Sequence, residues 1–327
     1  MASSAAVKQR RGLYGYPRVV DFAGRFAAPM TLAIVLVLAA IFIRPFFTPG
    51  NLATVLIQAS VLGMVTLGQT LVLLVRGLDM SVSAVMPLGV VLVLSIGHSL
   101  PTAEAVALAC VVALVIGTAN GLLVTKRQVP PFIATFGMLV FVEGLRLAYT
   151  HGQASGTVPH WLRAIGVGQT LHIPNAFLIW VVVTLLAAGA LLFTRYGRWV
   201  QAIGASPEAS RYAGIPIDWV VVACYAICSL LTLSGGLLLS GYLGYVDQYL
   251  GANYNLNSIA AGIVGGVTFT GGKGNFIGAA MGVLLLTVLI NLVVVAGLGV
   301  SWQFIVEGVV LVLAVALQGL RIYLGNR

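Results

Sequence analysis

Charged residues are scarce in this sequence. Only 8% of its 327 residues are charged, whereas an ordinary soluble domain carries roughly 25%. A soluble globule of this length could not cover its surface with so few charges, since charged side chains normally lie outside. No polar stretch is long enough to form a separate soluble domain. A soluble enzyme, a disordered protein, a disulfide scaffold and a single-span anchor are therefore excluded, and a polytopic membrane protein remains.

Acidic residues and cysteines are especially few. Asp and Glu number 8 against 17 Lys and Arg, which gives a net charge of +9. In a membrane protein, such an excess is better explained by basic cytoplasmic loops than by nucleic-acid binding. The three cysteines, Cys110, Cys224 and Cys228, all lie in apolar runs without a nearby His or carboxylate. We interpret them as small core residues and expect neither a metal nor another cofactor.

Hydrophobic residues, in contrast, make up 60% of the chain. A helix that crosses a bilayer needs about 20 mostly apolar residues, and the apolar runs are too long and too uniform for barrel strands. The sequence therefore predicts an all-α fold with about ten transmembrane helices. The predicted spans are 26–46, 52–75, 80–97, 102–124, 131–149, 174–194, 218–243, 256–270, 275–296 and 302–321.

The basic residues predict the orientation of these spans. With the N-terminus inside, fourteen fall in inner segments, Arg44 and Arg163 fall in outer segments, and Arg146 lies within a span. Lys and Arg gather on the cytoplasmic side, so both termini are expected to be cytoplasmic. The predicted organisation is a tail at 1–25, a single transmembrane domain at 26–321 and a tail at 322–327. The fourteen inner residues are Lys8, Arg10, Arg11, Arg18, Arg25, Arg76, Lys126, Arg127, Arg195, Arg198, Arg211, Lys273, Arg321 and Arg327.

A source of energy for transport is missing from the sequence. The segment 266–274 resembles a phosphate-binding loop but has Val267 and Gly274 where that motif needs Gly and Ser or Thr. Carboxylates for ion coupling are also few. Glu143 is followed by Arg146 at i+3, which favours a neutralised structural pair, and Glu307 lies about five residues into the last span. Asp79 is assigned to a cytoplasmic turn, and no motif of a membrane enzyme is present.

A chain without its own motor is expected to use that of a partner, and the inner loop 195–217 offers a contact for one. Ser206 is a suitable N-cap, followed by Pro207 in the first turn and Glu208 at the positive helix end. Gly214 is a suitable stop signal. We predict a short cytoplasmic helix from about Pro207 to Ala213. The alternative is an interfacial turn that binds no partner.

Four segments of the sequence resemble the permease subunits of bacterial ABC importers of the ribose, xylose, arabinose and galactose type, within the branched-chain amino acid permease superfamily. The resemblance covers nearly all of the chain from about residue 30. Each segment alone is weak, but four in the same order and spacing are specific. The segments are 67–83 (LGQTLVLLVRGLDMSVS), 120–137 (NGLLV to VPPFIATFG), 197–215 (GR to GI) and 259–274 (IAA to GGKG).

This resemblance implies a set of partners for the chain. It implies a second permease, identical or related, two ATPase subunits that dock on the cytoplasmic side, and a periplasmic binding protein that delivers the solute. The chain itself is then a non-catalytic subunit of the bacterial inner membrane. The implied coupling residues are Gly204, Pro207, Glu208, Ala209, Arg211 and Gly214.

The chain also departs from the family pattern. Arg76 and Ser83 replace glycines, Glu307 stands where Lys is frequent, and the stretch 242–257 is rich in Tyr and Asn. These departures leave open which sugar, polyol, signal molecule, nucleoside or amino acid is carried.

A solute such as a sugar needs hydrogen-bonding and aromatic side chains along its path rather than charges. Our candidates for this path are Asn120, Phe132, Thr135, Tyr254 and Asn257. The Tyr and Asn cluster is also compatible with an interfacial aromatic belt, or with a surface that docks the binding protein near Asp247. The alternative for the whole chain is an ion-coupled secondary transporter.

Overall fold

A computed structural model describes residues 16–96, 101–153, 158–245 and 250–325. Residues 1–15 of the predicted N-terminal tail, and Asp247 with the docking surface proposed around it, lie outside the described residues. The elements are, in chain order, α2 (Tyr16–Phe42), η1 (Arg44–Phe47), α3 (Pro49–Leu74), α4 (Val82–Ile96), α5 (Thr102–Lys126), α6 (Pro131–Thr150), α7 (His160–Gly166), β1 (Gln169–Thr170), β2 (Ile173–Pro174), α8 (Asn175–Phe193), α9 (Arg195–Ala205), α10 (Pro207–Tyr212), α11 (Ile217–Leu243), α12 (Tyr254–Val264), α13 (Phe276–Val295) and α14 (Val300–Gly325).

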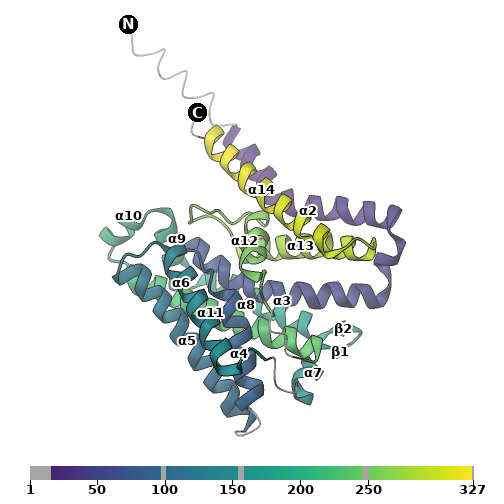
Figure 1. The fold of residues 1–327 in the computed structure, drawn as a ribbon. Helices are drawn as coiled ribbons and strands as arrows, with labels where there is room; N and C mark the ends of the chain where they lie inside the picture. The colour runs from purple at the N-terminus through teal and green to yellow at the C-terminus, as the bar shows by residue number, and fades with distance from the viewer. Residues whose placement is uncertain (1–15, 97–100, 154–157, 246–249, 326–327) are drawn as a thin grey trace.

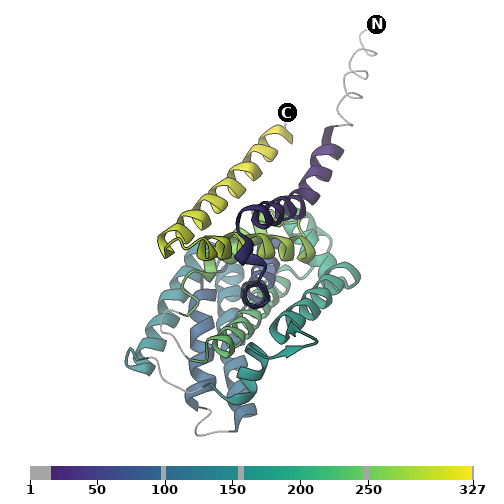
Figure 2. The same ribbon diagram turned by 90° about the vertical axis from the view of Figure 1, so that its right-hand side faces the viewer.

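Two long helices, α3 and α11, form the centre of the molecule. Both are apolar around their whole circumference, which is typical of a helix enclosed by other helices. They pack against each other, and α4 and α5 cover α11 while α8, α12 and α13 cover α3. In Figure 1, α3, α13 and the later part of α2 lie nearly parallel across the view, and α14 rises from the bundle together with the start of α2. Figure 2 shows that α14 and the start of α2 leave the same side of the bundle as two separate helices that rise in nearly the same direction.

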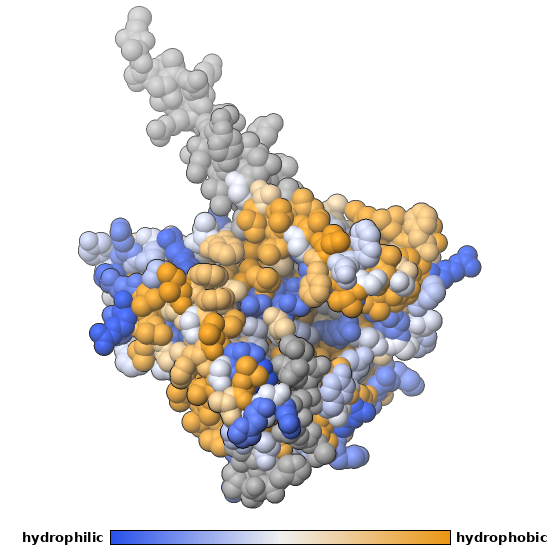
Figure 3. All heavy atoms as spheres, in the orientation of Figure 1, coloured by the Kyte–Doolittle hydropathy of each residue, from blue (hydrophilic) through white to orange (hydrophobic). Residues whose placement is uncertain are grey.

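Helices of membrane-spanning length occupy most of the predicted spans. Six helices in the described part of the chain are long and apolar enough to cross a membrane, namely α3, α5, α6, α8, α11 and α13. Apolar segments within α2, α4 and α14 are shorter. Large apolar side chains cover much of the surface, with the hydrophilic residues most prominent at the left and right edges of Figure 3. A surface of this kind requires lipid or other helices against it.

The predicted span 256–270 is wrong. Its helix, α12, ends at Val264, and residues 265–275 form turns rather than a continuation of the helix. Eleven residues of α-helix are about 16 Å long, roughly half of the ~30 Å hydrocarbon core. Four glycines with positive φ, Gly266, Gly271, Gly272 and Gly274, make the chain turn back toward α13. Hydropathy alone did not reveal this, because residues 265–270, which end the predicted span, are uncharged.

Smaller differences concern the ends of the bundle. The first helix, α2, already begins at Tyr16, and the last helix, α14, continues to Gly325, so helix extends into both predicted tails. The long loop near 150–173, which was predicted to lie on the outer side, contains a short helix, α7, and an antiparallel hairpin that pairs Gln169 with Pro174 and Thr170 with Ile173. Figure 1 places α10 and this hairpin at opposite ends of the molecule.

Candidate functional site

The segment predicted to contact a motor folds as expected from its capping residues. Ser206 is the N-cap of α10, and its hydroxyl accepts a hydrogen bond from the Ala209 amide at 3.2 Å. Pro207 occupies the first turn, where its missing amide costs nothing. The helix ends at Tyr212, and Gly214 follows with a φ of +76°. The predicted helix from Pro207 to Ala213 is therefore confirmed to within one residue.

One face of α10 is exposed and can contact another protein. Glu208, Ala209 and Arg211 are exposed, and Tyr212 is 93% exposed, whereas Ser210 is buried. An isolated helix of six residues is not stable in water, so packing must maintain it. The preceding helix α9 provides this support, because α10 packs against α9 and α9 packs against α8. Because α10 is exposed and α9 holds it in place, this surface is suited to bind a partner protein.

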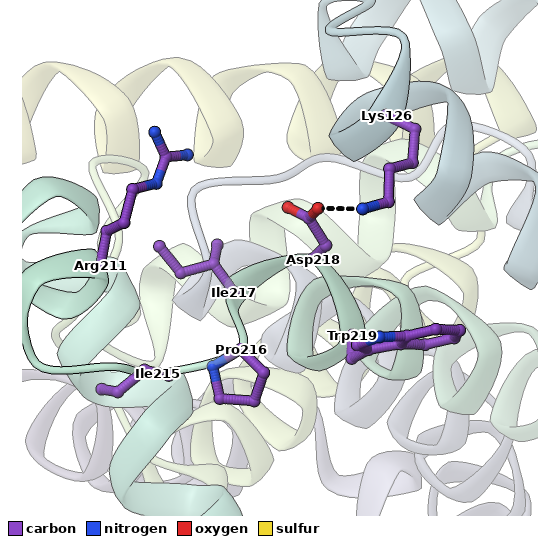
Figure 4. Close-up of a pocket in the computed structure, with 7 residues that line it drawn as sticks. All are labelled: Lys126, Arg211, Ile215, Pro216, Ile217, Asp218 and Trp219. Atoms are coloured by element: carbon purple, nitrogen blue, oxygen red, sulfur yellow. Dashed lines mark hydrogen bonds and ion pairs between the residues drawn. The ribbon is translucent and has the colours of Figure 1, made fainter.

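A shallow pocket of about 330 Å³ lies beside α10, where the chain enters α11 (Figure 4). Lys126 at the end of α5 forms an ion pair with Asp218 across this pocket, and Arg211 lies apart from the pair, at the left of the view. Trp219 is 70% exposed. Both partners of the ion pair are partly exposed, so its contribution to stability is small. The pocket is lined by Lys126, Arg211, Ile215, Pro216, Ile217, Asp218 and Trp219.

A second cavity, of about 320 Å³, lies between five helices, beside the middle of α3. Two candidate path residues, Tyr254 and Asn257 of α12, line it. The Asn257 amide donates a hydrogen bond to the Glu307 carboxylate of α14 at 3.1 Å. The further lining residues are Gln58, Leu62, Leu239, Tyr242, Leu243, Gly251, Ala252, Asn253, Thr287 and Ile290. Apolar walls with a few hydrogen-bonding groups are the usual composition of a site for a small uncharged molecule.

Sequence reasoning missed two polar residues of this cavity, Gln58 and Thr287. Gln58 lies early in α3, and Thr287 lies in the middle of α13. The Thr287 hydroxyl is buried and has no hydrogen-bond partner among the described residues. A polar residue within an apolar run is itself an indication of a functional position, and both could have been found in this way.

The other three path candidates lie elsewhere. Asn120 and Thr135 are fully buried around the connector between α3 and α4, which we define as residues 75–81. The Asn120 amide donates to the Ser81 hydroxyl at 2.9 Å, and the Thr135 hydroxyl accepts from the Met80 amide at 3.0 Å. Phe132 is 52% exposed and stacks on Phe136 with ring centroids 5.6 Å apart. None of the three lines the cavity.

The connector also contains Asp79, which is fully buried rather than in an open turn. Its Oδ1 accepts hydrogen bonds from the Ser81 amide at 2.9 Å and the Ser81 hydroxyl at 2.6 Å. The Gln69 side chain of α3, with its amide oriented to satisfy both groups, bonds to the Asp79 main-chain N–H and C=O at 3.2 Å each. Burial raises the pKa of Asp79 to about 6, against the smaller opposing effect of the Ser81 hydrogen bonds. The sequence could not reveal this burial, because it depends on neighbours from several helices.

The expected pair between Glu143 and Arg146 is present in α6. The Arg146 guanidinium donates to the Glu143 carboxylate at 2.6 Å, and the Arg146 side chain is 4% exposed while that of Glu143 is 40% exposed.

Cys224 and Cys228 are buried in α11 with free thiols. Among the residues that the structure describes, no cluster of three or more His, Cys, Asp or Glu is placed to hold a metal.

Comparison with known proteins finds one matching family and several similar permeases. Residues 51–315 match the family described as the permease component of the branched-chain amino acid transport system. The ribose import permease protein RbsC of Escherichia coli K12 is 34% identical over 278 residues, which cover 83% of this chain and 86% of the relative. RbsC of Bacillus subtilis 168 is 33% identical over 291 residues, covering 88% of this chain and 90% of the relative. No solved structure matches the chain.

A relative with a different sugar in its name is similar over the same region. The galactose/methyl galactoside import permease protein MglC of Escherichia coli K12 is 31% identical over 314 residues. The match covers 88% of this chain and 93% of the relative.

Proposed function

This chain belongs to the family of branched-chain amino acid transport system permease components, and on that premise we propose that it forms the membrane passage of an importer for a sugar or sugar-like solute. It is a multi-pass membrane permease subunit. The observation that supports this solute class is the cavity at Tyr254 and Asn257, where amide, hydroxyl and aromatic groups face a space of about 320 Å³. Such groups can hydrogen-bond the hydroxyls of a sugar. Relatives named as ribose and galactose permeases support the same class.

The partners follow from this assignment. Two ATP-binding-cassette ATPase subunits dock on the cytoplasmic side, a second permease copy or a related chain completes the passage, and a periplasmic binding protein delivers the solute. The ATPase subunits hydrolyse ATP, and this chain is not a catalyst. It resides in the bacterial inner membrane with both termini in the cytoplasm.

The exposed helix α10 is the proposed coupling helix. Glu208, Ala209 and Arg211 meet the ATPase, while Gly204 and Gly214 lie at the two ends of the segment. ATP binding favours a closed pair of ATPase subunits, and their closure displaces α10. ATP can shift the permease between outward-open and inward-open states only because it binds one state of the complex more tightly.

Uptake into sealed vesicles tests this function. The chain is reconstituted with ATP-binding-cassette ATPase subunits and a sugar-binding protein from the same genome, with ATP inside the vesicles and the binding protein outside. We expect uptake of labelled ribose or galactose that requires ATP, the ATPase subunits and the binding protein together, and no uptake of leucine. Uphill uptake by this chain alone would contradict the proposal.

Reversing the charge at Glu208 tests the coupling role of α10. Glu208→Arg is expected to lower ATP-dependent uptake about tenfold, because the positive charge lies at the positive end of α10 and on its exposed face. The inserted amount of protein should stay normal. Glu104→Arg is the matched control, since Glu104 is an exposed residue in the first turn of α5. Equal uptake in the two variants would count against the assignment of α10.

An ion-coupled carrier is the second candidate, because the Glu307 carboxylate lines the cavity. This candidate predicts that an ion gradient, without ATP, drives uptake into vesicles that contain only this chain. It also predicts that Glu307→Gln abolishes that uptake. If the chain is an importer subunit, vesicles that contain only this chain should show no uptake, with either Glu307 or Glu307→Gln.

A further inference from the structure

Three segments that are distant in sequence meet where α3 ends. They are the end of α3 with Arg76, the joint between α9 and α10, and the turn at Gly271–Gly272. Arg76 donates from Nε to the Gly204 carbonyl and from Nη2 to the Ala205 carbonyl, both at 2.7 Å. Carbonyls in the last turn of a helix lack partners within the helix and carry partial negative charge. A guanidinium with two parallel donors is well suited to bind two such carbonyls at once.

The backbone of Arg76 adopts a conformation that glycine adopts more easily. Its φ is +64°, in the left-handed region. The amides of Arg76 and Gly77 bond back to the Leu73 and Val72 carbonyls at 3.0 and 2.8 Å, as expected where a helix ends in a left-handed residue. Glycine here would end α3 without strain but would have no side chain to reach α9. The presence of Arg in this conformation therefore favours a role for its side chain.

The third segment closes the junction. The Gly272 amide donates to the Leu74 carbonyl at 2.9 Å. A Cβ added at Gly204 would lie 1.9 Å from the Leu74 oxygen and 2.3 Å from the Gly272 nitrogen, and one added at Gly271 would lie 2.4 Å from Cγ of Arg76. The three segments thus contact one another directly through their backbones, with Arg76 bonded across two of them.

Each segment leads to a part of the proposed importer. The joint between α9 and α10 carries the exposed coupling face. α3 leads to Gln58 and Leu62 in the cavity, and Gln58 is 16 residues, or about 24 Å, before Leu74. The turn at Gly271–Gly272 connects α12, with Tyr254 and Asn257, to α13. The junction therefore links the coupling face to helices that wall the cavity.

We propose that Arg76 is a positioning residue that clamps the end of α9 to the end of α3, so that displacement of α10 moves the cavity-lining helices with it. This inference rests on the proposed importer function. Contact between the segments is necessary for such transmission but does not by itself establish coupling. The experiments must therefore distinguish two effects of Arg76. One is the clamp, by which Arg76 holds the end of α9 to the end of α3, and the other is the transmission of movement from α10 to the cavity-lining helices. Both must also be distinguished from a general loss of stability.

Hydrogen exchange on the chain in nanodiscs tests the clamp without any partner. In Arg76→Gly, amides within 195–215 should exchange about tenfold faster, which is the change expected for the loss of about one charge-assisted hydrogen bond. Arg127→Ala, the control, removes an exposed arginine at the end of α5 and should leave exchange in 195–215 as in the wild type. Unchanged exchange in Arg76→Gly would refute the clamp, whether or not the chain is an importer.

Transport by the complete complex tests the transmission. In Arg76→Gly, solute taken up per ATP hydrolysed should fall about tenfold or more, while the ATP hydrolysis rate and the unfolding temperature stay near wild type. Arg76→Lys can re-form one of the two bonds and should give an intermediate ratio. If ATP hydrolysis and uptake fell in proportion, the proposal would be overturned, because Arg76 would then only stabilise the ends of α3 and α9 without transmitting movement. If the wild-type complex moved no solute, the proposed function and the transmission would both be contradicted. Unchanged hydrogen exchange in Arg76→Gly would contradict the clamp but not the importer function.

Discussion

The junction at Arg76 lies at the end of α3 and the cavity at Asn257 lies beside its middle, and the two regions are built in different ways. At the junction, backbone carbonyls and amides bond across segments, and Gly204 leaves no space for a side chain. In the cavity, side chains from several helices surround an open volume, and Asn257 to Glu307 is the hydrogen bond formed between two of the lining side chains. Backbone contacts have few alternative arrangements, whereas side chains can rotate to meet a ligand. The first region is suited to transmit a displacement, and the second is suited to accommodate a solute.

The largest effect that this comparison predicts is on stability at the junction. Gly204→Ala places a methyl group 1.9 Å from the Leu74 oxygen, so the segments must separate, at a cost of about 3 kcal/mol or more. We expect a sharp fall in the yield of folded protein and in its unfolding temperature in detergent. Gly50→Ala is the control, because nothing lies within 4 Å of a Cβ at Gly50. Similar unfolding temperatures for the two variants would show that the junction is not tightly packed.

A smaller effect is expected at the connector near the junction. The pKa of Asp79 is raised from 3.8 to about 6, so its contribution to stability is complete below pH ~3.8 and is lost as the pH rises through ~6. Between pH 5 and 7.5 this loss amounts to about 1 kcal/mol. Thermal unfolding at the two pH values should therefore show a smaller decrease in Asp79→Asn than in the wild type. An identical decrease in both proteins would contradict the burial of an ionisable Asp79.

The smallest effect on stability is expected in the cavity. Asn257→Ala removes a partly buried hydrogen bond to Glu307 and should change the free energy of unfolding by no more than about 1 kcal/mol. Its effect on transport should be larger, with KM for the solute raised about tenfold. Asn255→Ala is the control, since Asn255 is a neighbour on α12 that does not line the cavity. If both variants raised KM equally, the cavity would not be the solute site.

Local sequence was sufficient for the elements whose stability is local. Ser206, Pro207 and Gly214 predicted α10 because capping and stop signals act within a few residues. The pair of Glu143 and Arg146 was also predictable, since i+3 neighbours lie on one face of a helix. The apolar runs located most of the long helices, because each must satisfy its own backbone in lipid.

Tertiary structure decided which polar residues meet. The sequence did not predict that Asn120 and Thr135, two of the path candidates, bond to Ser81 and Met80 of the connector. Asp79 was assigned to a cytoplasmic turn, and the helices around it bury its side chain completely. Gln58 and Thr287 were overlooked, although they line the cavity with Asn257. The sequence around each of these residues does not indicate which distant helix the side chain contacts.

The sequence by itself determined that this is a helical membrane protein, where most of its helices run, and how α10 begins and ends. These properties follow from hydropathy and from contacts within a few residues of the chain. Only the tertiary structure decided that α12 stops at Val264, that Arg76 reaches α9, and that Tyr254 and Asn257 share a cavity with Glu307. Each of these depends on segments that are far apart in sequence, and their packing fixes which donors, acceptors and empty spaces come together.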